Sequence, residues 1–250
     1  MIIIPSVKKY FKNLAASKLV ATDASKLLVS ENIPLIGTKG GTGKNTITER
    51  SLLVGASGNA YAEKTIEEFI TEFLGMALSY VSQYPTQDAA HVKATSELGA
   101  NWHSYFCTDP ALSLTGTWVL NNWLSNTVIT DQRFHIDLGS AKVIKRIYYE
   151  NSHNSGGGTT TTGAKNFTFW GSNDVADFNE LTYAIDGTWT QIGGALQFDQ
   201  HGAADAADPK YILTPNNTAY RYYAVKIADN WGDVNYIGLR RIVLQTLKAA

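Results

Sequence analysis

The sequence predicts a mainly β protein whose largest part is an antiparallel β-sandwich or barrel. Short runs of alternating apolar and polar side chains recur between residues 133 and 247, and glycine, asparagine and aspartate separate them. The chain has 6 Trp, 13 Tyr and 9 Phe, most of them after residue 100. Short strands joined by such turns are typical of all-β domains, and the aromatic residues place the large core in the C-terminal part.

The charge balance and the apolar pattern exclude several classes of partner. The 250 residues carry 21 basic and 22 acidic side chains without a block of like charge, so we expect no nucleic acid partner. No apolar run reaches the roughly 18 residues of a membrane span, so we expect no membrane insertion. Residues 1–5 lack the roughly 7–15 apolar residues of a signal peptide, so we expect no export signal there.

Residues 1–62 form a first segment with little material for a core. Short apolar pieces, such as Leu27 to Val29 and Leu52 to Val54, alternate with polar turns, and the segment has no tryptophan. Such a segment cannot bury enough area to fold alone. We therefore expect an extended segment that needs a partner, either the rest of the chain or further copies of itself.

Residues 38–46, TKGGTGKNT, have the composition of a phosphate-binding loop. In such a loop glycines let backbone N–H groups surround the phosphates, a lysine supplies charge and a hydroxyl binds magnesium. Here Asn45 replaces that hydroxyl, Thr38 stands where the first glycine belongs, and no later apolar run supplies a second magnesium ligand. Nucleotide binding is therefore the least favoured hypothesis, and we expect no cofactor.

Residues 63–100 are predicted to form one α-helix followed by a polar connector. Thr65 and Glu68 have the spacing of a capping box, and the helix should end near Ser82, before Tyr84-Pro85. Apolar residues recur at helical spacing at Ile66, Phe69, Ile70, Phe73, Ala77, Tyr80 and Val81. Two interpretations stay open: a trimerising helix in a stem, or a helix packed against its own domain.

Residues 101–250 are predicted to form the sandwich. In the run RFHIDL, residues 133–138, Phe134 and Ile136 point to one face and His135 to the other, which is the period of a half-buried strand. Further strands are expected at residues 143–149, 164–172, 188–192, 197–198, 211–213, 221–227 and 240–244. The side chains expected on the core face of the later strands are Phe167, Phe169, Tyr223, Val225, Ile227, Ile242 and Leu244.

Two parts of the chain resemble known families. The pieces GGTG and LLVGASGNAY, with LVATDASKLLVSENIPL before them, resemble the glycine-punctuated segments of bacteriophage tail and head fibres, in which strands of three chains wrap together. The pieces FHIDLGSAKVIKRIYY, NFTFWGSND, TWTQI, YRYYAVKIADNWG and GLRRIVLQ resemble, in order, the strands of discoidin-type domains, the coagulation-factor C-type, galactose-binding-like sandwiches. The second resemblance implies an eight-stranded jelly roll that binds carbohydrates, lipid head groups or proteins through loops at one end.

The resemblance places a ligand site on two loops, residues 151–163 and 228–236. A flat aromatic face and a few fixed amide, carboxylate or imidazole groups recognise sugars, and both loops carry such residues. The candidate carbohydrate-binding residues are His153, Asn154, Asp229, Asn230, Trp231 and Tyr236. The alternatives are that Trp231 packs the end of the sandwich and that His153 is a solvated loop histidine.

Metal and enzyme chemistry are not expected. Many sugar-binding discoidin-type members have a glutamate ligand for calcium on the last strand, where this chain has Val243. Cys107 is the only cysteine, and the five histidines form no ligand pair. No arrangement of nucleophile, base and carboxylate can be placed from the spacing, and the resemblance is to domains that are not enzymes on their own.

The sequence thus suggests a bacteriophage virion fibre or appendage protein. Residues 1–62 would contact other virion proteins, the chain would assemble as a homotrimer, and the C-terminal domain would bind glycans or a host-surface receptor. The expected location is the virion, assembled in the host cytoplasm. The main alternative is a structural capsid or tail decoration protein whose sandwich makes protein–protein contacts.

Overall fold

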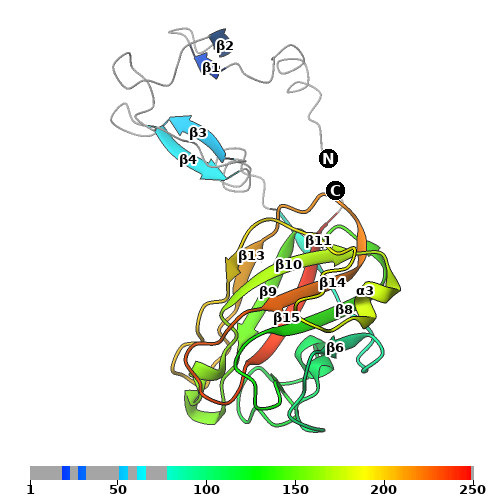
Figure 1. Ribbon diagram of the computed structural model, residues 1–250. Helices are drawn as coiled ribbons and strands as arrows, with labels where there is room; N and C mark the ends of the chain where they lie inside the picture. Colours follow the sequence, from blue (N-terminus) through cyan, green and yellow to red (C-terminus); the bar gives the residue numbers. More distant parts are fainter. Residues whose placement is uncertain (1–18, 23–27, 32–50, 56–60, 66–77, 249–250) are drawn as a thin grey trace. The chain divides into compact units, whose positions relative to one another are not determined.

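The computed structural model describes residues 19–22, 28–31, 51–55, 61–65 and 78–248 (Figure 1). The chain divides into two compact units: Met1–Ser79 with Ala249–Ala250, and Tyr80–Lys248. The phosphate-loop-like residues 38–46 and the centre of the predicted helix, residues 66–77, lie outside the described residues. Among the described residues, no helix is long and apolar enough to cross a membrane.

The first unit contains two antiparallel hairpins in its described residues. Strand β1 (Leu19–Thr22) pairs with β2 (Leu28–Glu31), and β3 (Ser51–Gly55) pairs with β4 (Tyr61–Thr65). Each pair is a separate two-stranded sheet. Because an isolated two-stranded ribbon is only marginally stable in water, such hairpins are stabilised by further packing.

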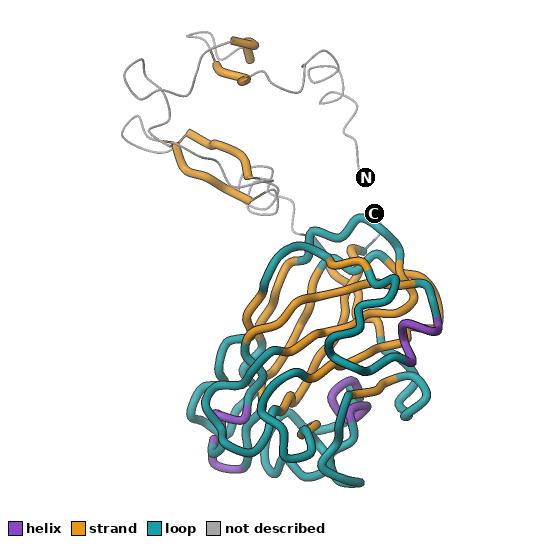
Figure 2. Tube along the Cα trace, viewed as in Figure 1, coloured by secondary structure: helices purple, strands orange, loops and turns teal. Residues whose placement is uncertain are grey.

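The second unit is an antiparallel β-sandwich, so the predicted fold class is confirmed. One sheet has the order β11-β10-β14-β8-β6, with β12 beside β10, and the other has the order β13-β9-β15-β5, with β7 beside β15. Figure 2 shows the strands of this unit in orange. Its strands are β5 (Tyr80–Gln83), β6 (Val92–Ala94), β7 (Trp123–Leu124), β8 (Gln132–Lys142), β9 (Arg146–Asn151), β10 (Asn166–Ser172), β11 (Thr190–Gln191), β12 (Leu196–Gln197), β13 (Lys210–Leu213), β14 (Tyr220–Ile227) and β15 (Gly238–Leu247). Its helical pieces are the 3-10 helices η3 (Ser104–Thr108), η4 (Ser155–Gly157) and η5 (Thr160–Thr162) and the α-helix α3 (Val175–Asn179).

The chain alternates between the two sheets along its longer strands. Strands β8, β10 and β14 belong to one sheet, whereas β9, β13 and β15 belong to the other. This crossing back and forth is typical of a jelly roll. The predicted inward rows are confirmed, since the main core contains the buried side chains of Phe167, Phe169, Tyr223, Val225, Ile227, Ile242 and Leu244.

Strand β8 differs from its prediction because it is buried on both faces. Phe134 and Ile136 join the main core, but His135 on the opposite face is also completely buried. His135 packs beside Phe178 and Trp189, which belong to the segment of residues 173–189 that carries α3. The segment covers the outer face of the sheet at this point. The alternation of apolar and polar residues in β8 therefore belongs to a strand that is packed on both faces, and not to a half-buried strand.

The sandwich begins earlier than the predicted boundary at residue 101. The predicted helix end at Tyr80–Ser82 is wrong, because Tyr80–Gln83 forms β5 and pairs with the last strand. The predicted connector also contains β6, which pairs with β8 and buries Val92 completely. Pairing with a free sheet edge overrides the local helical spacing of Tyr80 and Val81.

The first and last strands of the second unit meet at one end of the sandwich. Tyr80 is paired with Leu247 there, whereas Gly238, at the other end of β15, is paired with Leu124. The loops that follow β9 and β14 lie at this other end, because β9 ends at Asn151 opposite Leu239. The two predicted ligand loops are therefore distant from the site where the chain enters and leaves the sandwich (Figure 1).

Candidate functional site

The end of the sandwich where β14 ends and β15 begins carries the two predicted loops. We call this end the rim and define it by loops 113–121, 125–131, 151–163, 198–208 and 228–237. The backbone N–H groups of Trp231 and Asp233 donate to the carbonyl oxygens of Gly163, at 3.1 Å, and Thr161, at 3.3 Å. These bonds place loops 151–163 and 228–236 side by side.

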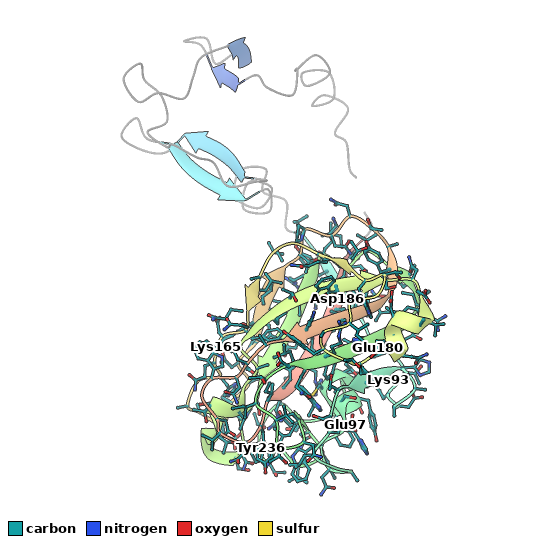
Figure 3. All side chains as sticks on the ribbon, in the orientation of Figure 1. Lys93, Glu97, Lys165, Glu180, Asp186 and Tyr236 are labelled. Carbon is teal, nitrogen blue, oxygen red and sulfur yellow. The ribbon has the colours of Figure 1, made fainter. Side chains whose placement is uncertain are left out.

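Trp231 is half-buried and held at its edge. The indole Nε1 donates to the carbonyl oxygen of Phe198 at 3.1 Å, which fixes the ring plane. Lys165 is labelled in Figure 3. Its ammonium lies 4.7 Å from the indole centroid of Trp231, within the range of a cation–π contact. Trp231 therefore combines a packing role with a partly accessible aromatic surface, next to a positive charge that the sequence interpretation missed.

Asp229 and Asn230 shape the second loop from within. Both carboxylate oxygens of Asp229 accept hydrogen bonds from Asn166, one from its backbone N–H at 2.9 Å and one from its side-chain amide at 2.8 Å. The Asn230 amide donates to the carbonyl oxygens of Asp233, at 2.9 Å, and Tyr236, at 2.8 Å. Its oxygen accepts from the N–H of Gly232 at 2.8 Å. These two side chains hold the loop that presents Trp231 and the partly exposed Tyr236.

Asn154 plays a similar part in the first loop. Its side-chain oxygen accepts from the backbone N–H groups of Ser155, at 2.9 Å, and Trp118, at 3.2 Å, so it ties loop 151–163 to loop 113–121. The neighbouring Gly157 has φ +71°, and a Cβ there would lie 2.4 Å from the backbone nitrogen of Ala204. The three consecutive glycines thus include one that close backbone contact requires.

His153 is not a solvated loop residue, because its side chain is completely buried. Its ring stacks on that of His201, with centroids 3.8 Å apart and planes 6° apart. Neither ring nitrogen of His153 has a hydrogen-bond partner among the described residues, and Nε2 lies 3.6 Å from Oδ1 of Asp205. The pKa of His153 is lowered to about 4, mainly by burial and in addition by His201 and Arg240, against the attraction of Asp205. The imidazole is therefore neutral near pH 7.

Arg240 links two of the rim loops by hydrogen bonds, and its sequence context does not indicate this role. Its side chain is completely buried, and it donates to the carbonyl oxygen of His153 at 3.0 Å. It also donates to the carbonyl oxygens of Ser113, Thr115, Gly116 and Thr117. Burial lowers the pKa of this guanidinium. One cation thus gathers the carbonyl groups of two rim loops, and nothing in the local pattern RRIVL indicates this.

The rim therefore separates into supporting and accessible groups. His153, Asn154, Asp229 and Asn230 are engaged in packing or internal hydrogen bonds, as described above. Trp231, Tyr236 and Lys165 are half-buried, and Thr161 is exposed. An aromatic face beside ammonium and hydroxyl donors can contact both the C–H and the O–H groups of a ligand. In the described part of the chain, no group of three or more His, Cys, Asp or Glu side chains could hold a metal ion.

Comparison with known proteins gives matches only among solved structures. No family model matches the chain, and no curated protein matches it. Among the similar structures is a family 32 CBM from C. perfringens NanJ in complex with galactose, with 10% identity, TM-score 0.46, and coverage of 67% of this chain and 100% of that chain.

Two further structures are similar to the sandwich. Chitosan-binding module 1 from a chitosanase/glucanase of Paenibacillus sp. IK-5 has 17% identity, a TM-score of 0.42, and coverage of 66% of this chain and 98% of that chain. An F5/8 type C domain from Bacteroides fragilis has 13% identity, a TM-score of 0.44, and coverage of 69% and 98% respectively. The fold of this chain is established by its own strand order and pairing.

Proposed function

We propose that the sandwich binds glycans through the rim. The observation that carries this proposal is the hydrogen bonding of loop 228–236 to loop 151–163, which brings Trp231, Lys165 and Thr161 to one surface. A partly exposed indole offers a flat face to sugar C–H groups, while the ammonium and hydroxyl groups offer hydrogen bonds to sugar oxygens. The supporting bonds of Asp229 and Asn230 fix these groups before a ligand arrives, which lowers the entropic cost of binding.

We further propose that the chain is a bacteriophage virion fibre or appendage protein that assembles as a homotrimer. The support is the glycine-punctuated sequence of residues 18–62 together with the two hairpins β1-β2 and β3-β4. Two-stranded ribbons gain stability when neighbouring chains extend or cover them. In this arrangement the first unit contacts other virion proteins, and the rim, at the far end of the sandwich from β5, contacts the host surface.

A glycan array probed with the full chain and with Trp231→Ala tests the binding proposal. The wild-type chain should bind at least one glycan class, and the variant should bind it about tenfold more weakly or not at all, because the aromatic face is lost. Tyr211→Ala is the matched control, since Tyr211 is an exposed aromatic residue, 53% accessible, on a sheet face away from the rim. Equal array signals for wild type and Trp231→Ala would remove the rim as the site.

One surface favours the second candidate function, a structural decoration protein. On the five-stranded sheet, β13 carries the exposed side chains of Tyr211 and Leu213, at 53% and 43% accessibility. An apolar and aromatic sheet face of this kind suits contact with another virion protein. Absence of glycan binding, together with protection of Tyr211 from chemical modification in the assembled particle, would favour this function over the first.

A further inference from the structure

A second concave surface lies at the opposite end of the sandwich from the rim. It is an open cavity of about 870 Å³ between the end of β10 and the beginning of β14. Its walls are formed by Ser172, Asn173, Asp174, Thr188, Arg221 and two tyrosines, Tyr220 and Tyr222. We call it the β14 cavity. The rim begins where β14 ends, so the length of this strand separates the two surfaces by about 20 Å.

The two tyrosines are fixed in place by close packing. A Cβ atom at Gly171 would lie 2.2 Å from Cδ2 of Tyr220, so the Tyr220 ring occupies the space that any side chain at position 171 would need. The Tyr222 ring stacks on Phe178 with centroids 5.0 Å apart. Within the described part of the chain, neither tyrosine hydroxyl has a hydrogen-bond partner. Tyr222 is only 4% exposed, because its ring packs against Phe178 and the Arg221 guanidinium lies over it, 5.0 Å from its centroid. The cavity wall thus offers the partly exposed ring of Tyr220, with the tyrosine O–H groups beside it.

Arg221 offers hydrogen-bond donors to the cavity, and the carboxylate of Asp137 balances its positive charge. Its Nε and Nη2 each donate to one carboxylate oxygen of Asp137 at 2.8 Å, which is a bidentate pair. The Nη1 donors stay outside this pair, and the side chain is 43% exposed. Its backbone N–H donates to the side-chain oxygen of Asn173 at 2.8 Å, which joins the two walls of the cavity. Asp137 therefore fixes the orientation of the guanidinium and balances its positive charge.

The remaining charges disfavour an anionic ligand. Asp174 is exposed on the wall, and one of its carboxylate oxygens accepts from the N–H of Ala176 while the other is available. Asp177 lies behind the wall and accepts hydrogen bonds from the hydroxyl groups of Ser172 and Thr188. Because Asp137 already balances Arg221, the two other carboxylates leave a negative excess around the cavity.

We propose that the β14 cavity binds a neutral saccharide unit, as a second ligand site independent of the rim. The volume falls within the range of about 300–1,000 Å³ for small-molecule sites. The Tyr220 ring contacts sugar C–H groups, Arg221 and the tyrosine hydroxyls donate to sugar oxygens, and Asp174 accepts from sugar hydroxyls. The negative excess directs the site toward uncharged rings and away from uronic or sialic acids.

Saturation-transfer NMR on the full-length Trp231→Ala chain tests the proposal, because this background removes the proposed rim contact. The probes are glucose, galactose, mannose and N-acetylglucosamine, with glucuronate as the anionic comparison. At least one neutral sugar should show transfer, and glucuronate should show less. Addition of Tyr222→Phe or Arg221→Lys should weaken the affinity about fivefold each, as expected for one lost hydrogen bond.

Tyr211→Phe in the same background is the matched control and should leave the transfer unchanged. Arg221→Lys loses the bidentate pair with Asp137 and should lower the thermal midpoint, so thermal unfolding must show that every variant is folded at the temperature of the NMR measurement. No transfer from any neutral sugar, transfer that is insensitive to Tyr222→Phe and Arg221→Lys, or stronger transfer from glucuronate would each overturn the proposal. These outcomes leave the rim proposal untouched, because the rim is tested by the loss of array binding in Trp231→Ala. Conversely, if Trp231→Ala does not change array binding, the β14 cavity is still tested by the effect of Tyr222→Phe and Arg221→Lys on saturation transfer.

Discussion

The imidazole rings of His153 and His201 stack in parallel with their centroids 3.8 Å apart, and both side chains are buried. Asp205 and Asp208 lie 3.6 Å and 3.7 Å from their ring nitrogens, and Arg240 donates to the backbone of His153. A neutral His153 ring stacks on His201, whereas a proton on His153 would place a cation next to the buried Arg240 guanidinium in a site away from water. The surroundings of His153 therefore favour its neutral state.

Acid should destabilise the fold through His153 and His135, two buried histidines. The pKa of His153 falls from its ordinary 6.5 to about 4, and burial lowers the pKa of His135 to about 4 as well. Since the unfolded chain takes up these protons more readily, stability is fully present above pH 6.5 and is lost as the pH falls from 6.5 toward 4. Thermal midpoints measured across this window should fall steadily.

The control for the acid effect is His153→Phe, which keeps an aromatic ring in the stack but cannot take up a proton. Its midpoint should depend less on pH between 6.5 and 4 than that of the wild type, and the residual slope should reflect His135. An unchanged slope in His153→Phe would show that protonation of His153 does not carry the effect.

Removal of the Arg240 guanidinium should loosen the rim. Arg240→Met leaves the carbonyl oxygens of loop 113–117 and of His153 without their donor, and the loss should be on the order of 3 kcal/mol in the free energy of unfolding. Arg241→Met is the matched control, because the equally buried Arg241 donates to only one carbonyl, that of Leu112, among the described hydrogen bonds. Denaturant titration measures both, and equal losses would contradict the assignment.

Gly171→Ala should destabilise the sandwich by about 1–3 kcal/mol, the usual cost of forcing extra atoms into a packed site. The new Cβ would meet the Tyr220 ring at 2.2 Å, so either the ring or β10 must move. Gly194→Ala serves as the control, because nothing lies within 4 Å of a Cβ at that position. Thermal unfolding of the two variants checks the difference, and a Gly171→Ala chain as stable as Gly194→Ala would refute the close packing.

Lys165→Gln should alter the rim without unfolding it. The ammonium contact to the Trp231 ring contributes about 0.5–1 kcal/mol at an accessible site, so the thermal midpoint should change little. The tryptophan emission of the variant should shift, and its affinity for an array-positive glycan should fall by about threefold if the ammonium contacts the sugar. Lys142→Gln, on β8 at the opposite end of the sandwich, should change neither quantity.

The sequence predicted the fold where local periodicity decides it. Phe167 and Phe169 on β10, and Tyr223, Val225 and Ile227 on β14, alternate with a period of two and occupy the core as expected. Strand β5 was missed because Tyr80 and Val81 also fit helical spacing, and only pairing with β15 decides between the two. The double burial of β8 depends on residues 173–189, which are remote from it in sequence.

The rim was predicted as a pair of loops but not as a set of contacts. Trp231 and its neighbours were found because aromatic and polar residues share one short turn. His153 and His201 are separated by 48 positions (201 − 153), and no local pattern indicates that they stack. Arg240 follows apolar residues on a strand and would ordinarily be expected on an outer face, so its burial among carbonyl groups depends on the fold of loop 113–117.

The pairing of β5 with β15 has a mechanical consequence. A load applied between Tyr80 and a glycan held at the rim acts along the strand axes, because Tyr80 lies at the end of the sandwich opposite the rim. Under such shear the hydrogen bonds between Tyr80–Gln83 and Leu244–Leu247 carry the force together, whereas a load across the strands would break them one after another. The same sandwich entered through a loop at the rim would lack this protection, so the position of β5 would suit the adhesive role that we propose.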